Sequence, residues 1–148
     1  MAKASHWLEP HPSGLYVKPA DLWIDPSRPV DRAAVTHGHA DHARSGHGSV
    51  FATPETLAIM ALRYGVDAEA SHNQAFAYGS GFERGGVRFS FHPAGHVLGS
   101  AQILMEYRGE RIVVTGDYKR RPDPTCALFE VVPCDIFITE ATFGLPVF

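Results

Sequence analysis

The sequence has few cysteines, no long apolar run and no excess of positive charge, and each absence excludes a class of protein. Its two cysteines, Cys126 and Cys134, are too few for a disulfide framework and lack the C-x-x-C spacing of a structural zinc site, so we expect free, buried thiols. No stretch approaches the roughly 18 consecutive apolar residues of a membrane span. The first residues lack the apolar core of a secretory signal, which favours a cytoplasmic protein.

The net charge of −3 excludes a broad positive field as a means of attracting nucleic acid. Any such partner must be held by local positive charge or by bound metal. With 45% hydrophobic and 20% charged residues, the composition is that of an ordinary soluble globular protein, and 148 residues are enough for one domain with its own core.

Apolar patterning predicts an α/β protein in which helix packs on sheet. Residues 54–64 predict the clearest helix, because apolar residues recur at helical spacing, Thr53 is a suitable N-cap and Gly65 a suitable end. The other apolar runs predict strands and one tight turn. The predicted strands are a short hairpin within 7–18, with 15–17 as one arm, and runs at 22–24, 33–36, 75–78, 87–92, 101–107, 111–115 and 136–140, with the turn at 108–110.

Histidines are concentrated after one predicted strand: four of the nine, His37, His39, His42 and His47, lie between positions 37 and 47. Residues two apart in extended chain point the same way, so His37 and His39 can share one metal ion. Asp41 and His42 follow where the chain could turn into a helix and face a neighbouring position. Three imidazoles and one carboxylate favour zinc or a similar first-row metal over calcium or magnesium. The pattern predicts two adjacent ions.

Two further predicted strands end in candidate ligands, His96 and Asp117, as active-site groups often do in α/β folds. Asp25 also ends a strand, and its residue type fits either support of the ligands or capping of the turn before Pro26. The remaining histidines lie outside these segments of candidate ligands. We expect His6, His11, His47 and His72 not to be ligands, and His92 to lie behind the ligands or on the surface.

Taken together, HGHADH at 37–42, GHVLGSA at 95–101 and TGD at 115–117 resemble the successive metal-binding motifs of the metallo-β-lactamase superfamily. The resemblance implies an αββα sandwich. It also implies that His37, His39 and His96 hold one ion, that Asp41 and His42 hold a second, and that Asp117 bridges the two. The ions would be divalent, zinc first and manganese as the alternative.

The segment ITEATFG at 138–144 resembles the acidic motif that marks the β-CASP nucleases of this superfamily, with Glu140 as the acid. The stretches at 24–43 and 116–124 resemble bacterial ligase-associated DNA exonucleases and messenger-RNA 3′-end-processing exonuclease-like proteins. This implies hydrolysis of DNA or RNA by a metal-activated hydroxide, with Asp41, Asp117 and Glu140 as catalytic residues. The alternative for Glu140 is a solvent-facing strand end. Three adjacent basic residues either meet the phosphate backbone or form a solvated loop: Lys119, Arg120 and Arg121.

Members of that branch continue into a β-CASP insert and a C-terminal remainder that supplies a last ligand histidine. No histidine follows His96 in this sequence. We therefore expect residues 1–148 to form the N-terminal half of an incomplete sandwich. The chain is then a fragment, the product of a truncated reading frame, or one part of a split protein whose fold a second chain completes. Two other functions stay open: a hydrolase of small thioesters or lactams, and an inactive metal-binding fragment.

Overall fold

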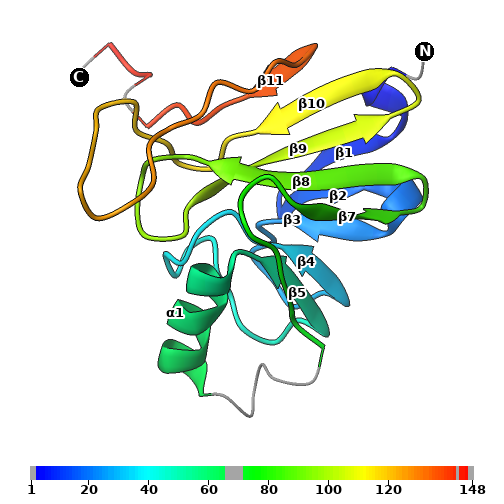
Figure 1. Cartoon of the computed structure of the whole chain (residues 1–148). Helices are drawn as coiled ribbons and strands as arrows, with labels where there is room; N and C mark the ends of the chain where they lie inside the picture. Colours follow the sequence, from blue (N-terminus) through cyan, green and yellow to red (C-terminus); the bar gives the residue numbers. More distant parts are fainter. Residues whose placement is uncertain (1–2, 66–71, 143, 147–148) are drawn as a thin grey trace.

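The computed structural model describes residues 3–65, 72–142 and 144–146, which form two packed β-sheets and one α-helix (Figure 1). The first sheet has six strands in the order β1-β2-β3-β4-β5-β6. Strands β1 to β3 are antiparallel, and β3 to β6 are parallel. Their bounds are β1 Leu8–His11, β2 Gly14–Val17, β3 Leu22–Ile24, β4 Arg32–Ala34, β5 Ser49–Ala52 and β6 Gln74–Ala75, with short 3-10 turns η1 at Ala4–His6 and η2 at Lys18–Ala20.

The second sheet has five strands in the order β11-β10-β9-β8-β7. Its strands are antiparallel except for β10 and β11, which run parallel. Alternating burial along β8 places Val87, Phe89 and Phe91 on the inner face, as a half-buried strand requires. The bounds are β7 Gly81–Arg84, β8 Val87–Pro93, β9 Ala101–Tyr107, β10 Glu110–Val114 and β11 Ile136–Ile138.

The main core lies between the two sheets. Phe51 on β5 stacks on Phe82 of β7 with 4.5 Å between ring centroids, and Phe82 in turn stacks on Phe89 of β8. Apolar side chains from the inner faces of both sheets complete this layer, among them Ile24, Ile103, Met105 and Ile112. Burial of these faces against each other is the main term that stabilises the sandwich.

Helix α1, Pro54–Tyr64, covers the outer face of the six-stranded sheet beside β5 (Figure 1). Thr53 caps its first turn by accepting a hydrogen bond from the Thr56 backbone N–H, and Gly65 ends it with a positive φ of 91°. Fully buried Met60 contacts a second apolar cluster that includes Val35 and Val50. The helix therefore closes the side of the sheet that the main core does not.

The sequence-based prediction of α/β architecture is confirmed, and so are the bounds of the helix and of β9. The strand expected at 33–36 ends earlier, because the Thr36 N–H donates to the Asp25 carboxylate instead of a neighbouring strand. The expected runs at 75–78 and 136–140 are likewise shorter, and β5 and β7 were not predicted. Neither cysteine is disulfide-bonded, as expected, but both are half-buried rather than buried. No helix within the described ranges is long and apolar enough to span a bilayer.

Candidate metal centre

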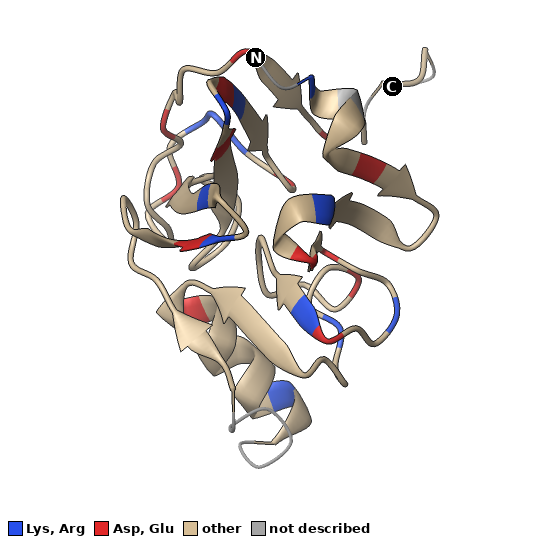
Figure 2. Cartoon of the chain, turned by 90° about the vertical axis from the view of Figure 1, so that its right-hand side faces the viewer, with Lys and Arg blue, Asp and Glu red and all other residues tan. Residues whose placement is uncertain are grey.

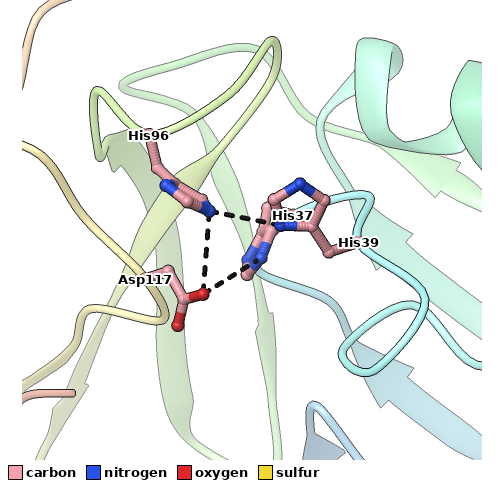
Figure 3. Close-up of side chains that lie close together, drawn as sticks. All are labelled: His37, His39, His96 and Asp117. Carbon is pink, nitrogen blue, oxygen red and sulfur yellow. Dashed lines mark hydrogen bonds and ion pairs between the residues drawn. The ribbon is translucent and has the colours of Figure 1, made fainter. Parts of the chain in front are cut away.

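The predicted ligands come from three separate segments that meet at one edge of the sandwich. Residues 37–42 follow β4, His96 lies in the turn between β8 and β9, and Asp117 follows β10. Strand β4 belongs to one sheet, and β8 to β10 belong to the other. The packing of the two sheets therefore brings these segments together. Figure 3 shows that His37, His39, His96 and Asp117 direct their side chains toward one point.

Each of these four residues offers one nitrogen or oxygen atom, and the four atoms all lie within 4.8 Å of one another. His96 Nε2 is 3.2 Å from His39 Nδ1. Asp117 Oδ2 is 3.6 Å from His96 Nε2 and 3.7 Å from His37 Nε2. Three imidazoles and one carboxylate at these separations are a donor set that suits zinc.

His37 has a ring nitrogen that forms no hydrogen bond with any described residue. The residue is fully buried and its Nδ1 lies 3.0 Å from Thr36 Oγ1, while its Nε2 has no hydrogen-bond partner within residues 3–65, 72–142 and 144–146. Burial lowers the pKa of His37 to about 4, so the imidazole is neutral at physiological pH. A buried polar atom without a partner is costly, and a metal ion at the cluster would satisfy it. The residues present therefore fit a metal ion.

A second group of donors lies beside the first. His42 Nε2 is 3.5 Å from Asp41 Oδ2 and 3.5 Å from Asp117 Oδ1. Asp117 thus directs one oxygen toward His37 and His96 and the other toward His42. Asp41 is exposed, so this second group is more open than the first. Asp41 and His42 lie in a single turn closed by hydrogen bonds to the His39 carbonyl, and the expected helix at this point is absent.

Asp25 supports this second group of donors through hydrogen bonds. One of its oxygens accepts from the Thr36 N–H at 2.8 Å, and the other accepts from Thr36 Oγ1 at 2.6 Å and from His42 Nδ1 at 2.8 Å. Burial acts to lower the pKa of His42, but the hydrogen bond to Asp25 and its negative charge outweigh burial and raise it. The sequence left two roles open for Asp25, support of the ligands and capping of the turn before Pro26. The structure shows that Asp25 contacts the candidate ligand His42.

Two small residues that the motifs contain shape the other loops. The Ser100 hydroxyl oxygen accepts from the His96 and Val97 backbone N–H groups at 3.0 and 3.2 Å, which holds the His96 turn. Gly116 has a φ of 55°, and a Cβ at this position would lie 2.5 Å from Thr36 Oγ1. Sequence reasoning missed both supports, although each residue stands inside a motif, because their roles depend on contacts across the fold.

Glu140 lies beside the donors rather than among them. Its carboxylate accepts from the Thr142 and Tyr118 backbone N–H groups, each at 3.3 Å. Hydrogen bonding lowers the pKa of Glu140, and the bond from Thr142 has the largest effect. It lines an apolar hollow of about 240 Å³ between the sheets, together with His42 and Asp117. Glu140 is therefore a half-buried anion at the rim of the cluster, in contrast to the solvent-facing alternative.

The other histidines stay outside the cluster. His47 is buried and accepts a hydrogen bond from the Val30 N–H at Nδ1. His92 lies on β8, where its Nε2 is 2.9 Å from Ser90 Oγ and its Nδ1 is 3.3 Å from the Glu130 carboxylate. His6, His11 and His72 are exposed. None of these five belongs to the four-residue group that the described residues form around His37.

Comparison with known proteins places this arrangement in a family. The profile described as the Metallo-beta-lactamase superfamily matches residues 13–143. A protein of Opitutus terrae described as a probable DNA ligase is 32% identical over 136 residues, which cover 90% of this chain and 13% of that protein. Endoribonuclease YSH1 of Mycosarcoma maydis is 32% identical over 78% of this chain and 17% of its own length. Cleavage and polyadenylation specificity factor subunit 3-I of Arabidopsis thaliana is 30% identical over 93% and 24%.

The chain spans less than a quarter of the length of these three relatives. Among solved structures, a metallo-beta-lactamase of Cronobacter sakazakii has a TM-score of 0.53 at 17% identity, over 79% of this chain and 57% of that one. Zinc-bound PqqB of Methylobacterium extorquens has a TM-score of 0.52 at 17% identity, over 62% and 40%. The fold is shared, which confirms the sequence-based prediction of the N-terminal portion of this sandwich.

Proposed function

Because the chain belongs to the metallo-beta-lactamase superfamily, and its curated relatives include endoribonucleases, we propose that it is the metal-binding part of a nuclease that hydrolyses DNA or RNA. The reaction is cleavage of a phosphodiester by water.

The observation that carries the proposal is the placement of Asp117. Its Oδ2 faces His37 and His96, and its Oδ1 faces His42 at 3.5 Å. One carboxylate between two donor groups supports two divalent cations, zinc in the first instance and manganese as the alternative. In this assignment His37, His39 and His96 bind one ion, Asp41 and His42 bind the second, and Asp117 binds both.

Bound divalent metal supplies a water of lowered pKa and neutralises charge on the phosphate oxygens. The chain's own residues do the positioning. Asp25 holds His42 with Nδ1 protonated, which leaves Nε2 free as a donor atom. The neutral state of buried His37 supports the same role, since a protonated imidazole cannot bind metal.

Glu140 is proposed as a catalytic-site residue that orients a proton donor for the leaving oxygen, as the β-CASP resemblance implies. Its lowered pKa keeps it ionised at neutral pH, and an ionised carboxylate can orient an imidazole by accepting its N–H. That imidazole would belong to polypeptide beyond the N-terminal portion described here. A second chain or segment that completes the sandwich is therefore part of the proposal, supported by the greater length of the relatives.

The first experiment measures metal per chain by mass spectrometry after purification. We compare wild type with His37→Ala and Asp117→Ala, and with His11→Ala as a control, because His11 is exposed and lies outside the cluster. We expect one to two first-row metal ions per wild-type chain, fewer in the two site variants and an unchanged number in the control. Folded wild-type protein that holds no metal would refute the metal centre.

The second experiment measures hydrolysis of end-labelled DNA and RNA oligonucleotides, with a thioester and a lactam substrate in parallel. Loss of hydrolysis in EDTA and in Asp117→Ala is the expected result for the oligonucleotides. Hydrolysis of the small substrates alone would favour the small-molecule hydrolase. The assay is run on the chain alone and with the adjoining segment supplied in trans, because the proposal places the proton-donating imidazole outside these residues. A chain that binds metal and hydrolyses none of the substrates in either case is the inactive fragment, which contradicts the proposed nuclease.

A further inference from the structure

The turn that carries His96, residues 94–100, is held by neutral hydrogen bonds. Acidic and basic residues are interspersed over the ribbon (Figure 2), but residues 94–100 include no Asp, Glu, Lys or Arg. Within the turn, the Ser100 N–H donates to the Val97 carbonyl at 2.9 Å, and the Ala94 N–H donates to the Ser100 carbonyl at 3.1 Å. These bonds set the shape of the turn, whereas its position relative to the other ligands depends on contacts outside it.

Three hydroxyl groups from outside the turn donate to its last two carbonyls. The Thr53 hydroxyl donates to the Gly99 carbonyl at 2.7 Å, and the Thr56 hydroxyl donates to the same oxygen at 3.3 Å. The Tyr78 hydroxyl, between β6 and β7, donates to the Ser100 carbonyl at 2.9 Å. Burial raises the pKa of Tyr78 to about 12, so the phenol keeps the proton that it donates. We call Thr53, Thr56 and Tyr78 the hydroxyl clamp.

Two members of the clamp stand at the start of α1. Thr53 Oγ1 also accepts from the Thr56 N–H as the N-cap of the helix, and both threonines are buried. Gly99 has a φ of 76°, and a Cβ there would lie 2.7 Å from Glu55 Cβ and 2.8 Å from Thr53 Oγ1. Only glycine therefore lets the turn approach the helix so closely. The clamp joins α1, which packs on the six-stranded sheet, to a turn of the five-stranded sheet.

The same turn is bonded to the other two ligand segments through backbone groups. The Ala101 N–H, directly after the turn, donates to the carbonyl of Thr36 at 2.8 Å, and Thr36 precedes His37. On the other side, the Lys119 N–H from the loop after β10 donates to the Ala94 carbonyl at 3.0 Å. All these bonds use backbone and hydroxyl atoms, so they leave the imidazole nitrogens of the turn and of its neighbours available to a metal ion.

From these contacts we infer that the hydroxyl clamp holds His96 in its ligand position before metal binds, which makes Thr53, Thr56 and Tyr78 positioning residues of the metal centre. The inference rests on the metal centre of the proposed function and adds the residues that preorganise it. A ligand that is already in place loses little conformational freedom when the ion binds, so affinity for the ion rises. The clamp acts on metal binding through His96.

Amide hydrogen exchange of EDTA-treated protein, followed by NMR, tests whether the turn is set before metal binds. The His96 and Val97 N–H groups donate to the Ser100 hydroxyl, so they should exchange slowly in wild type. Tyr78→Phe/Thr56→Val removes two of the three clamp hydroxyls and should speed exchange of both amides about tenfold, with amides in the middle of β9 unchanged. Turn amides that become slow only after zinc is added would overturn the inference.

Zinc affinity, measured by competition with a chelator, tests whether the clamp supports the site. Tyr78→Phe/Thr56→Val should bind zinc about tenfold more weakly than wild type. Thr56→Ser keeps the hydroxyl and should stay within about twofold of wild type. Tyr16→Phe is the matched control, because it removes a phenol hydroxyl that donates to Asp21 at 2.9 Å on β2, outside the turn. An equal loss of affinity in the double variant and in Tyr16→Phe would contradict the inference.

A purely structural role is tested by repeating the affinity measurement in a His96→Ala background. There the substitutions Tyr78→Phe and Thr56→Val should cost no further zinc affinity, because the ligand that the clamp positions is gone. They should still lower the midpoint of urea unfolding. A further tenfold loss of zinc affinity in this background would mean general loosening of the fold and would refute the positioning role.

The exchange and affinity measurements separate this inference from the proposed function. Wild type that binds zinc with an affinity unaffected by the clamp substitutions refutes only the clamp. Wild type that binds zinc, shows the expected effects of the clamp substitutions and hydrolyses no oligonucleotide refutes only the nuclease. Folded wild type that binds no zinc or manganese refutes both, because the clamp then has no ligand to position.

Discussion

Asp25 accepts a hydrogen bond from His42 Nδ1 at 2.8 Å, which leaves His42 Nε2 directed at Asp41 and Asp117. The same carboxylate accepts two hydrogen bonds from Thr36, next to His37. Asp25 therefore ties both donor groups to the end of β3. It adopts a positive φ of 45°, a conformation that aspartate tolerates better than most residues.

Asp25→Asn should reduce metal affinity by about 10- to 100-fold, because the amide no longer fixes the tautomer of His42 as a carboxylate does. Competition with a chromogenic chelator measures the affinity. Asp31→Asn is the control, since Asp31 is exposed and its side chain makes no hydrogen bond or ion pair within the described ranges. Equal affinities of the two variants would show that Asp25 does not support the site.

Gly116→Ala and Gly79→Ala separate backbone strain from a clash at the site. Both glycines have positive φ, 55° and 81°, so each substitution should cost about 1–2 kcal/mol of unfolding free energy. Only the Gly116 variant adds a Cβ 2.5 Å from Thr36 Oγ1, whereas no atom of the described residues lies within 4 Å of a Cβ at Gly79. We expect a larger loss of stability in urea and lower metal content for Gly116→Ala alone. A metal content equal to that of Gly79→Ala would contradict this account.

His47 should make stability depend on pH in the metal-free protein. Burial lowers its pKa below the ordinary value of 6.5, so the folded state binds a proton less readily than the unfolded state. Its contribution is complete above pH 6.5 and is lost as pH falls below that value, by at most about 1.4 kcal/mol per pH unit. His47→Asn keeps an acceptor for the Val30 N–H and does not titrate there.

Urea denaturation between pH 5 and 8 measures this effect. Wild type should lose stability more steeply than His47→Asn below about pH 6.5. His37 and His96 also have lowered pKa values, but they are present in both proteins, so the difference between the two slopes isolates His47. Parallel curves for the two proteins would disprove the prediction.

Met60→Ala should cost about 2–5 kcal/mol of unfolding free energy, because Met60 is a fully buried apolar side chain of α1 that packs in the cluster beneath the helix. Leu62→Ala on the same helix is the control. Leu62 is 90% exposed, so its truncation should change stability by no more than about 0.5 kcal/mol. Thermal or urea unfolding followed by circular dichroism compares them. Similar losses in the two variants would mean that α1 does not pack through Met60.

Local sequence was sufficient for several elements. The helix at Pro54–Tyr64 was predicted with its cap and its end, because Thr53, the apolar spacing and Gly65 act within a few residues of one another. Strand β9 was also predicted, because the apolar run at Ala101–Tyr107 is likewise a local pattern. Strands β5 and β7 were missed, and β7 shows why: Gly81–Arg84 has little apolar pattern and is a strand because it pairs with β8.

The sequence by itself determined which residues carry the candidate chemistry, because ligand type and close spacing are local properties: His37, His39, Asp41 and His42 stand within six positions. Only the tertiary structure decided that Asp117 faces both donor groups, that Asp25 holds His42, and that Tyr118 lies beside Phe129 and Phe137. These relationships join residues far apart in the chain. They follow from the packing of two sheets on one core, which no local pattern specifies.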